Sequence, residues 1–136
     1  MKLRILNGPN LNLRGLRAPE VYGVTSFDEY LHQLKKEFPG TTIEYRQHNV
    51  EGELINELHS FGFTFDGIIF NAGGYTHTSV AIGDAVKAIQ TPVIEVHISN
   101  IFAREDFLHV SFIAPHCAGS ISGFWLSGYQ LAIQYF

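Results

Sequence analysis

Short apolar segments that end in groups of polar residues constrain the fold of this chain more than any other feature. Three of them occupy residues 3–6, 66–71 and 92–97, and segments with helical spacing of apolar residues lie between them. A further strand is expected at 41–46, which alternates and is rich in β-forming residues, and another at 110–114. Strands that alternate with helices form a parallel sheet covered on both faces, so the sequence predicts an α/β protein.

The helices expected between these strands define the layers of the fold. Ser26 and Glu29 form a capping-box pattern at the start of the first helix, and Asn49 is placed to cap the second. A third helix is expected at about 78–90 and a last one runs to residue 136, after a loop at 119–123. With right-handed crossovers, this spacing favours a flavodoxin-like three-layer sandwich with a five-stranded parallel sheet in the order 2-1-3-4-5. We expect residues 1–136 to form one domain.

Composition and charge narrow the class of protein. The 136 residues are 46 % hydrophobic, which is a normal globular level and argues against disorder. The formal net charge of −4 and the absence of a basic stripe argue against a nucleic-acid partner. No apolar run approaches the roughly 18 residues of a membrane span. The chain starts with a strand pattern rather than a signal peptide and has one cysteine, so we expect a cytoplasmic location.

A long polar loop follows the first strand. Residues 7–23 begin with a Gly-Pro turn, carry Arg14, Arg17 and Tyr22, and lack the periodicity of a helix or strand. A loop of this length in a small domain is usually functional or disordered. A free phenol titrates near pH 10, so Tyr22 can act as a base at neutral pH only if nearby cations stabilise its phenolate. Otherwise Tyr22 is an aromatic side chain that packs the loop onto the core.

The three central strands of the predicted sheet all end in polar residues, at 7–10, 71–77 and 97–100. Ligands bind beyond the carboxyl ends of the strands in an open parallel sheet, at the point where the strand order reverses. A scaffold does not by itself require polar residues after every strand, so we expect a shared binding site at this edge.

Several of these residues also have a purely structural interpretation. Asn10 and Asn71 can bond to the backbone of their own turns, and His77 can cap a helix. Gly73 and Gly74 can form a tight turn, or they can expose backbone N–H groups to an anion at a helix N-terminus. Each residue taken alone leaves both interpretations open.

His97 is different because Glu95 lies two residues earlier on the same strand and therefore on the same face. A carboxylate beside an imidazole fixes the tautomer of the ring and favours its protonated form, as a general acid requires. His116 and Cys117 are adjacent but lack the spacing of metal ligands, so no metal site is expected. No Walker A or dinucleotide-binding glycine pattern is present.

The same residues carry a resemblance to a known family. Three motifs contribute, at residues 7–23, at 71–79 and at 95–105, in the same order and spacing over essentially the whole chain. The chain resembles the type II 3-dehydroquinate dehydratases of the shikimate pathway of aromatic amino acid biosynthesis. The resemblance implies a flavodoxin-like fold and a cofactor-free trans-dehydration of 3-dehydroquinate to 3-dehydroshikimate through an enolate. It also implies a homododecamer built as a tetramer of trimers.

The resemblance further assigns roles by matching position. Tyr22 would be the base, kept ionised by Arg17 and Arg104, and Asn10 would stabilise the enolate through a bound water. His97 would protonate the leaving hydroxyl. The remaining implied residues are Glu95, which would orient His97, the substrate-binding residues Asn71, His77, Ile98 and Ser99, and Asp84, which would reach a neighbouring subunit's site. The loop at 14–20 would act as a lid.

Two positions depart from the family pattern. Leu108 stands where the family usually has an arginine that contacts substrate hydroxyls, and Ala18 stands where it usually has an acidic residue. Neither change removes the implied base, acid or enolate contact, so an active enzyme is predicted.

Two other functions are compatible with the predicted fold. A module that binds a flavin or a phosphorylated ligand rests on fold analogy alone, and the absence of a Ser/Thr-rich phosphate loop after the first strand counts against it. A catalytically silent relative retained for its assembly is suggested by Leu108. The absorbance of a conjugated enone product would distinguish the dehydratase from both.

Overall fold

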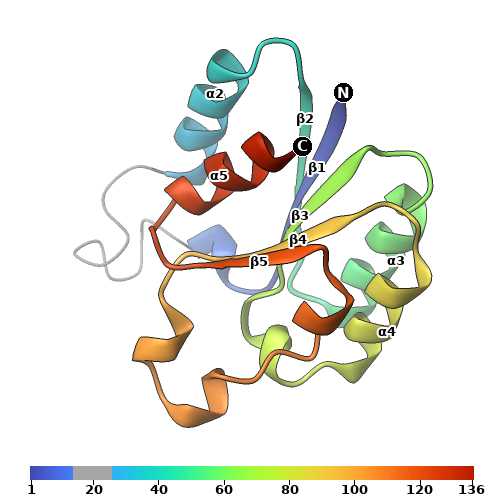
Figure 1. The fold of residues 1–136 in the computed structure, drawn as a ribbon, viewed down its shortest axis with the longest axis vertical. Coiled ribbons are helices and arrows are strands. Elements are labelled where there is room, and N and C mark those ends of the chain that lie inside the picture. Colours follow the sequence, from blue (N-terminus) through green and yellow to red (C-terminus); the bar gives the residue numbers. More distant parts are fainter. Residues whose placement is uncertain (14–25) are drawn as a thin grey trace.

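A parallel sheet in the predicted order forms the centre of the molecule. The computed structural model describes residues 1–13 and 26–136. The strands β1 (Lys2–Asn7), β2 (Thr42–Gln47), β3 (Gly67–Asn71), β4 (Val93–His97) and β5 (Gly119–Ser122) pair in the order β2-β1-β3-β4-β5, and each pair is parallel (Figure 1). The expectation of a flavodoxin-like α/β fold is confirmed.

Helices cover both faces of the sheet. The helices α2 (Phe27–Glu37) and α5 (Ser127–Tyr135) lie on one face, and α3 (Glu51–Phe61) and α4 (Val80–Ala88) lie on the other (Figure 1). Alternate residues of the strands therefore enter two separate cores, as the two-residue period of a strand requires. In β1, Leu3 and Ile5 pack toward α2 and α5, whereas Leu6 packs toward α3 and α4. Each fully buried aliphatic side chain stabilises the folded state by about 1.5–3 kcal/mol relative to an exposed one.

The predicted start of the first helix is confirmed. The Oγ atom of Ser26 accepts a hydrogen bond from the Glu29 N–H at 3.1 Å. Asp28 and Glu29 lie in the first turn of α2, and Lys35 and Lys36 lie in the last turn. The charges at both ends therefore interact favourably with the helix dipole.

The prediction for the last strand is wrong. Residues 110–114 form no strand, and β5 instead covers Gly119–Ser122, where a loop was expected. The apolar pattern was misleading because Val110 is 57 % exposed and because the Ser111 hydroxyl closes a turn by accepting from two backbone N–H groups. β5 is a short edge strand of small and polar residues, which lacks the apolar alternation that identifies buried strands.

Two helix boundaries also differ from the predictions. Val50, not Asn49, precedes α3 at its cap position and makes no side-chain cap, because the Oδ1 atom of Asn49 accepts from Asn10 N–H instead. The helix predicted at about 78–90 is α4, Val80–Ala88, capped by Ser79. The residues before it form the 3-10 helix η2, Gly73–His77.

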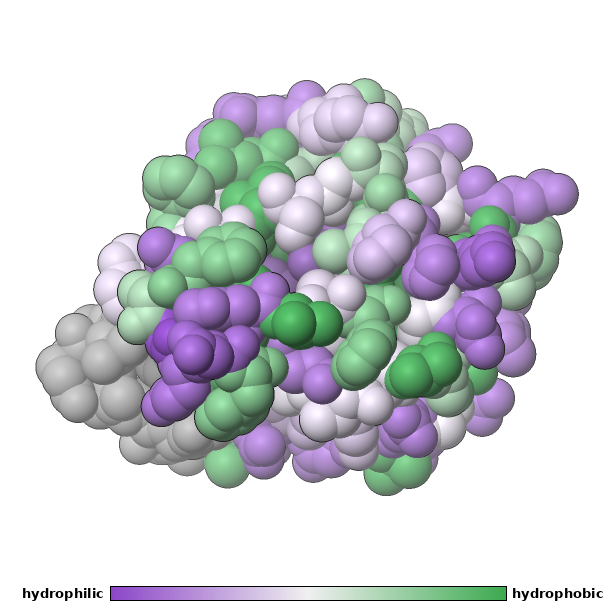
Figure 2. Space-filling view, turned by 60° about the horizontal axis from the view of Figure 1, so that its bottom comes forward, coloured by the Kyte–Doolittle hydropathy of each residue, from purple (hydrophilic) through white to green (hydrophobic). Residues whose placement is uncertain are grey.

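The surface combines apolar and polar residues. On the face shown in Figure 2, hydrophobic residues lie in several groups separated by hydrophilic ones. The exposed large side chains of the described residues include Phe102, Phe107, Phe124 and Trp125. Among residues 1–13 and 26–136, no helix combines the length and the apolar composition needed to cross a bilayer.

Candidate active site

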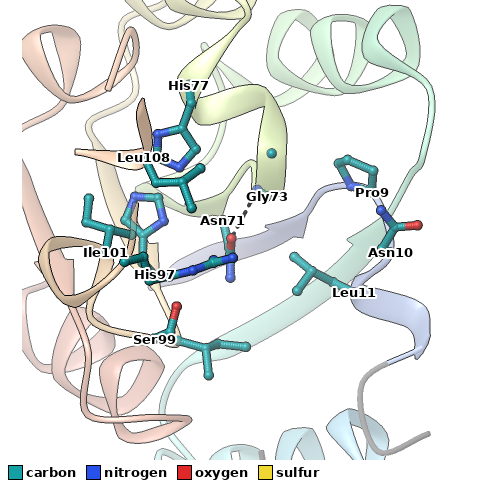
Figure 3. Close-up of a pocket in the computed structure, with 13 residues that line it drawn as sticks. Pro9, Asn10, Leu11, Asn71, Gly73, His77, His97, Ser99, Ile101 and Leu108 are labelled. Atoms are coloured by element: carbon teal, nitrogen blue, oxygen red, sulfur yellow. Dashed lines mark hydrogen bonds between the residues drawn. The ribbon is translucent and has the colours of Figure 1, made fainter. Parts of the chain in front are cut away.

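An open cavity of about 230 Å³ lies at the carboxyl edge of the sheet (Figure 3). It is formed by the segments that follow β1, β3 and β4, as the sequence predicted for a switch-point site. Its lining includes seven of the predicted site residues, which are Asn10, Asn71, His77, His97, Ile98, Ser99 and Arg104.

His97 is the last residue of β4 and lies over Glu95, as predicted from their spacing. The His97 Nε2 atom is 3.2 Å from Glu95 Oε1, although the two atoms are not aligned for a hydrogen bond. Only 5 % of His97 and 2 % of Glu95 is exposed to solvent. A buried carboxylate therefore supports an imidazole whose other edge borders the cavity, which is the arrangement expected for a general acid.

The carboxylate of Glu95 has partners that the sequence did not indicate. Its Oε2 atom accepts from the Ser111 hydroxyl at 2.5 Å, and its Oε1 atom accepts from the Ser120 hydroxyl at 2.6 Å. Burial acts to raise the pKa of Glu95, but the contacts with His97, Ser111 and Ser120 outweigh it and hold that pKa below its ordinary value of 4.5. Glu95 is therefore kept ionised although it is buried.

His77 reaches the cavity from the end of η2 and stacks on His97. The ring centroids are 6.1 Å apart and the planes are inclined by 27° (Figure 3). The Nδ1 atom of His77 lies 2.7 Å from the carbonyl oxygen of Val110, which can only accept, so Nδ1 carries a proton. In the neutral ring the Nε2 atom then remains available to accept a hydrogen bond from a ligand.

Asn71 joins the end of β3 to a buried polar network. Its Oδ1 atom accepts from the Gly73 N–H at 3.1 Å, and its amide donates to the Tyr129 hydroxyl at 3.0 Å. The Tyr129 hydroxyl in turn donates to Asn7 Oδ1 at 2.8 Å. Asn71 thus stabilises its own turn, as its structural interpretation predicted, and it also lines the cavity.

Asn10 lies across the cavity from His97 in a left-handed backbone conformation, with φ of 69° (Figure 3). Its N–H donates to Asn49 Oδ1 at 3.0 Å, and the Gln47 amide donates to the same Oδ1 atom and to the Gly8 carbonyl. The end of β2 therefore holds the turn that follows β1. Sequence reasoning missed Gln47 and Asn49, since nothing in their local pattern relates them to residue 10.

Four predicted site residues are not among the described residues that line the cavity: Arg17, Tyr22, Asp84 and Glu95. Tyr22 and Arg17 fall within residues 14–25, outside the described part of the chain. Asp84 is exposed on α4 and does not line the cavity. Leu108, the departure from the family pattern, does line it.

Other reactive groups of the described residues do not enter the site. Burial, followed by the charge of Glu95, raises the pKa of the Cys117 thiol to about 12, so this cysteine is neutral at physiological pH and unsuited to nucleophilic attack. Residues 1–13 and 26–136 contain no group of three His, Cys, Asp or Glu side chains arranged to hold a metal ion.

The fold and the cavity together define a class: an α/β protein of flavodoxin-like topology with a histidine–glutamate pair at its switch point. Comparisons with known proteins identify the family. The family model described as Dehydroquinase class II matches residues 1–136. The chain is 51 % identical over 136 residues to the 3-dehydroquinate dehydratase of Dinoroseobacter shibae, covering 98 % of this chain and 91 % of the relative.

Solved structures agree with this result. The type II dehydroquinase of Butyrivibrio crossotus superposes with a TM-score of 0.94 at 39 % identity, covering 99 % of this chain and 96 % of that one. A 3-dehydroquinate dehydratase-like protein of Bifidobacterium longum has a TM-score of 0.67 at 27 % identity, covering 99 % and 94 %. The chain belongs to the class II dehydroquinase family.

Proposed function

We propose that this chain catalyses the trans-dehydration of 3-dehydroquinate to 3-dehydroshikimate. The observation that carries the proposal is the His97–Glu95 pair at the cavity, combined with relatives of about this length that are named 3-dehydroquinate dehydratases. The reaction needs a general acid for a leaving hydroxyl, and a buried imidazole beside an ionised carboxylate supplies one.

The first step is the removal of a proton beside the ketone. Tyr22, as tyrosinate, takes the proton, and the electron pair of the broken C–H bond moves into an enolate. Arg17 and Arg104 keep the phenolate ionised, and Asn10 stabilises the enolate oxygen through a bound water. Arg104 and Asn10 line the cavity, which supports these two assignments.

In the second step the enolate collapses and the C–O bond breaks. His97 donates its proton to the departing hydroxyl, so that water leaves and a conjugated enone remains. Asn71, His77, Ser99 and the Ile98 backbone bind the carboxylate and hydroxyls of the substrate. Their shared position around the cavity supports this role.

The active form is a homododecamer, a tetramer of trimers, in which Asp84 reaches a neighbouring site. Asp84 is exposed on α4, away from the cavity of its own chain, as such a role requires. Exposed aromatic side chains such as Phe102 and Phe107, 65 % and 71 % accessible, are suited to burial between subunits. We further infer a single catalytic domain that acts in the cytoplasm without a cofactor or nucleic acid.

An absorbance assay for the enone product tests the proposal. We expect turnover of 3-dehydroquinate in the presence of a metal chelator and without added nucleotide. Tyr22→Phe should lose most activity while it keeps the wild-type melting temperature. His97→Ala should still exchange the proton beside the ketone with solvent, but its dehydration should fall by about 10²–10⁴-fold.

Two results would contradict these assignments. Normal turnover by Tyr22→Phe would exclude Tyr22 as the base. Equal loss of exchange and dehydration in His97→Ala would show that His97 is not specifically the acid. A folded wild-type protein without any turnover would instead support a catalytically silent relative, for which Leu108 in the cavity lining is the structural reason.

A further inference from the structure

We propose that Ser111 and Ser120 are positioning residues of the acid, which hold the Glu95 carboxylate in one orientation against His97. The inference rests on the proposed function, because it assigns to these hydroxyls a role in the second step of that reaction. Neither residue lines the cavity, so both act through Glu95.

The direction of both hydrogen bonds follows from the chemistry of the groups. Ser111 Oγ lies 2.5 Å from Oε2 of Glu95, and Ser120 Oγ lies 2.6 Å from Oε1. An ionised carboxylate can only accept hydrogen bonds, so each serine hydroxyl donates its single hydrogen bond to Glu95. Bonds of this length to a charged acceptor are among the stronger ones in proteins.

Ser111 is further restrained from its other side. Its Oγ atom accepts from the backbone N–H of Ile113 at 3.2 Å and of Ala114 at 3.0 Å. Two N–H groups therefore occupy its lone pairs, and the hydroxyl proton can point only toward Glu95. The turn that replaces the predicted strand at 110–114 thus has a specific consequence, the fixed orientation of one hydroxyl.

Ser120 is brought to Glu95 by the register of the sheet. The two residues are directly paired between β4 and β5. The Oε1 atom of Glu95 consequently lies between two groups, with the Ser120 hydroxyl at 2.6 Å and His97 Nε2 at 3.2 Å. Since the two serines hold different oxygens, the carboxylate cannot rotate without breaking a bond to one of them.

Loss of both serine hydroxyls should move a proton from His97 to Glu95. Glu95 is 2 % exposed, and without these donors its buried charge is left with His97 as its remaining close partner. The favourable response is transfer of the imidazolium proton to the carboxylate, which neutralises both groups and leaves His97 as a neutral imidazole, a much weaker acid. The other titratable neighbours do not replace it: Cys117 stays a neutral thiol, and His77 stacks on the ring of His97.

This role differs from simple satisfaction of a buried charge. A merely structural role would weaken the fold and lower every catalytic step together. A positioning role lowers the dehydration step, which needs the acid, and spares proton exchange beside the ketone, which needs the base. The ratio of the two rates therefore separates the alternatives.

The experiment measures both rates for the full-length protein with 3-dehydroquinate in D₂O, exchange by NMR and dehydration by enone absorbance. For the double variant Ser111→Ala/Ser120→Ala we expect dehydration to fall by about 10²-fold, as for loss of a general acid, with exchange within about threefold of wild type. Each single variant should show a smaller shift of the same ratio. The variant Ser120→Thr should keep the wild-type ratio of the two rates. Threonine retains the hydroxyl that alanine lacks, and residue 120 is an exposed position of the edge strand, which has room for the added methyl group.

Ser60→Ala is the matched control, since Ser60 is an exposed serine of α3 and should leave both rates unchanged. The inference is overturned if exchange and dehydration fall by the same factor in the double variant, or if neither falls. If the double variant does not fold, the two single variants decide by the same ratio. A folded wild-type protein that neither exchanges nor dehydrates would overturn the proposed function itself, which is a distinct result.

Discussion

The two sides of the cavity are built in different ways. On the acid side, side-chain hydrogen bonds from distant parts of the chain meet on the carboxylate of Glu95. On the opposite side, which we call the enolate side and define as Gly8 to Asn10 with Asn49, the position of Asn10 depends on backbone conformation and close backbone packing. Changes on the acid side should therefore lower dehydration more than proton exchange, whereas changes on the enolate side should lower exchange and dehydration together.

The enolate side leaves little room for substitution. The Gly8 N–H donates to the carbonyl of Asn71 at 2.7 Å. A Cβ atom at residue 8 would lie 2.5 Å from the carbonyl oxygen of Ala72, which is backbone and cannot move aside cheaply. Gly8 is thus required by the close approach of the segments that follow β1 and β3.

The largest expected effect on stability is that of Gly8→Ala. The clash should destabilise the protein by about 3 kcal/mol or more, or prevent folding. Urea denaturation monitored by circular dichroism measures it. Gly52→Ala is the matched control, because a Cβ atom there meets nothing within 4 Å and the change replaces glycine inside α3. A Gly8→Ala protein as stable as wild type would contradict the view that backbone packing defines this side.

Glu95→Gln should lower stability by about 2 kcal/mol at neutral pH, because an amide loses the charged acceptor for two hydroxyls. The pKa of Glu95 is lowered in the folded state, so the advantage of the wild type is complete above pH 4.5 and is lost as the pH falls through that lowered pKa. Denaturation of both proteins between pH 7 and pH 3 checks this. The dehydration rate should fall more than the exchange rate, and equal losses would place Glu95 outside the acid function.

A smaller effect is expected for Asn49→Ala, which removes the acceptor of the Asn10 N–H. This bond lies at an exposed position, so its loss should lower the stability by only about 0.5–1 kcal/mol. Exchange and dehydration should fall together, by about tenfold, because enolate formation precedes both. Asn56→Ala, at an exposed position of α3, serves as the control. A selective loss of dehydration would remove the proposed difference between the two sides.

The smallest change in stability is expected for Asn10→Gly. Glycine adopts a φ of 69° without steric cost, so the folded state should keep its stability to within about 1 kcal/mol. Asn10→Ala should be less stable than Asn10→Gly by about 1 kcal/mol, because alanine is strained in this conformation. Both variants should lose enolate stabilisation, and melting curves paired with the enone assay measure the two effects. Full activity in Asn10→Gly would show that the amide has no catalytic role.

Much of the fold could be predicted from local patterns. The strands β1, β3 and β4 were found from apolar runs that end in polar residues, β2 was found from its alternation and β-forming residues, and α2 was found from its cap at Ser26. β5 was missed because an edge strand of the sequence Gly-Ser-Ile-Ser lacks that signal. The more apolar segment at 110–114 resembles a strand but is bent by the turn around Ser111.

The sequence by itself determined the parallel sheet, its strand order and the polar edge, since periodicity and short connections leave few other arrangements. It also placed Glu95 and His97 on one face, because residues two apart on a strand must share it. Only the tertiary structure decided which other groups hold the key residues on the acid side and on the enolate side of the cavity. Ser111 and Ser120 reach Glu95, and Asn49 reaches Asn10, through contacts between residues far apart in the chain, and no local pattern records such contacts.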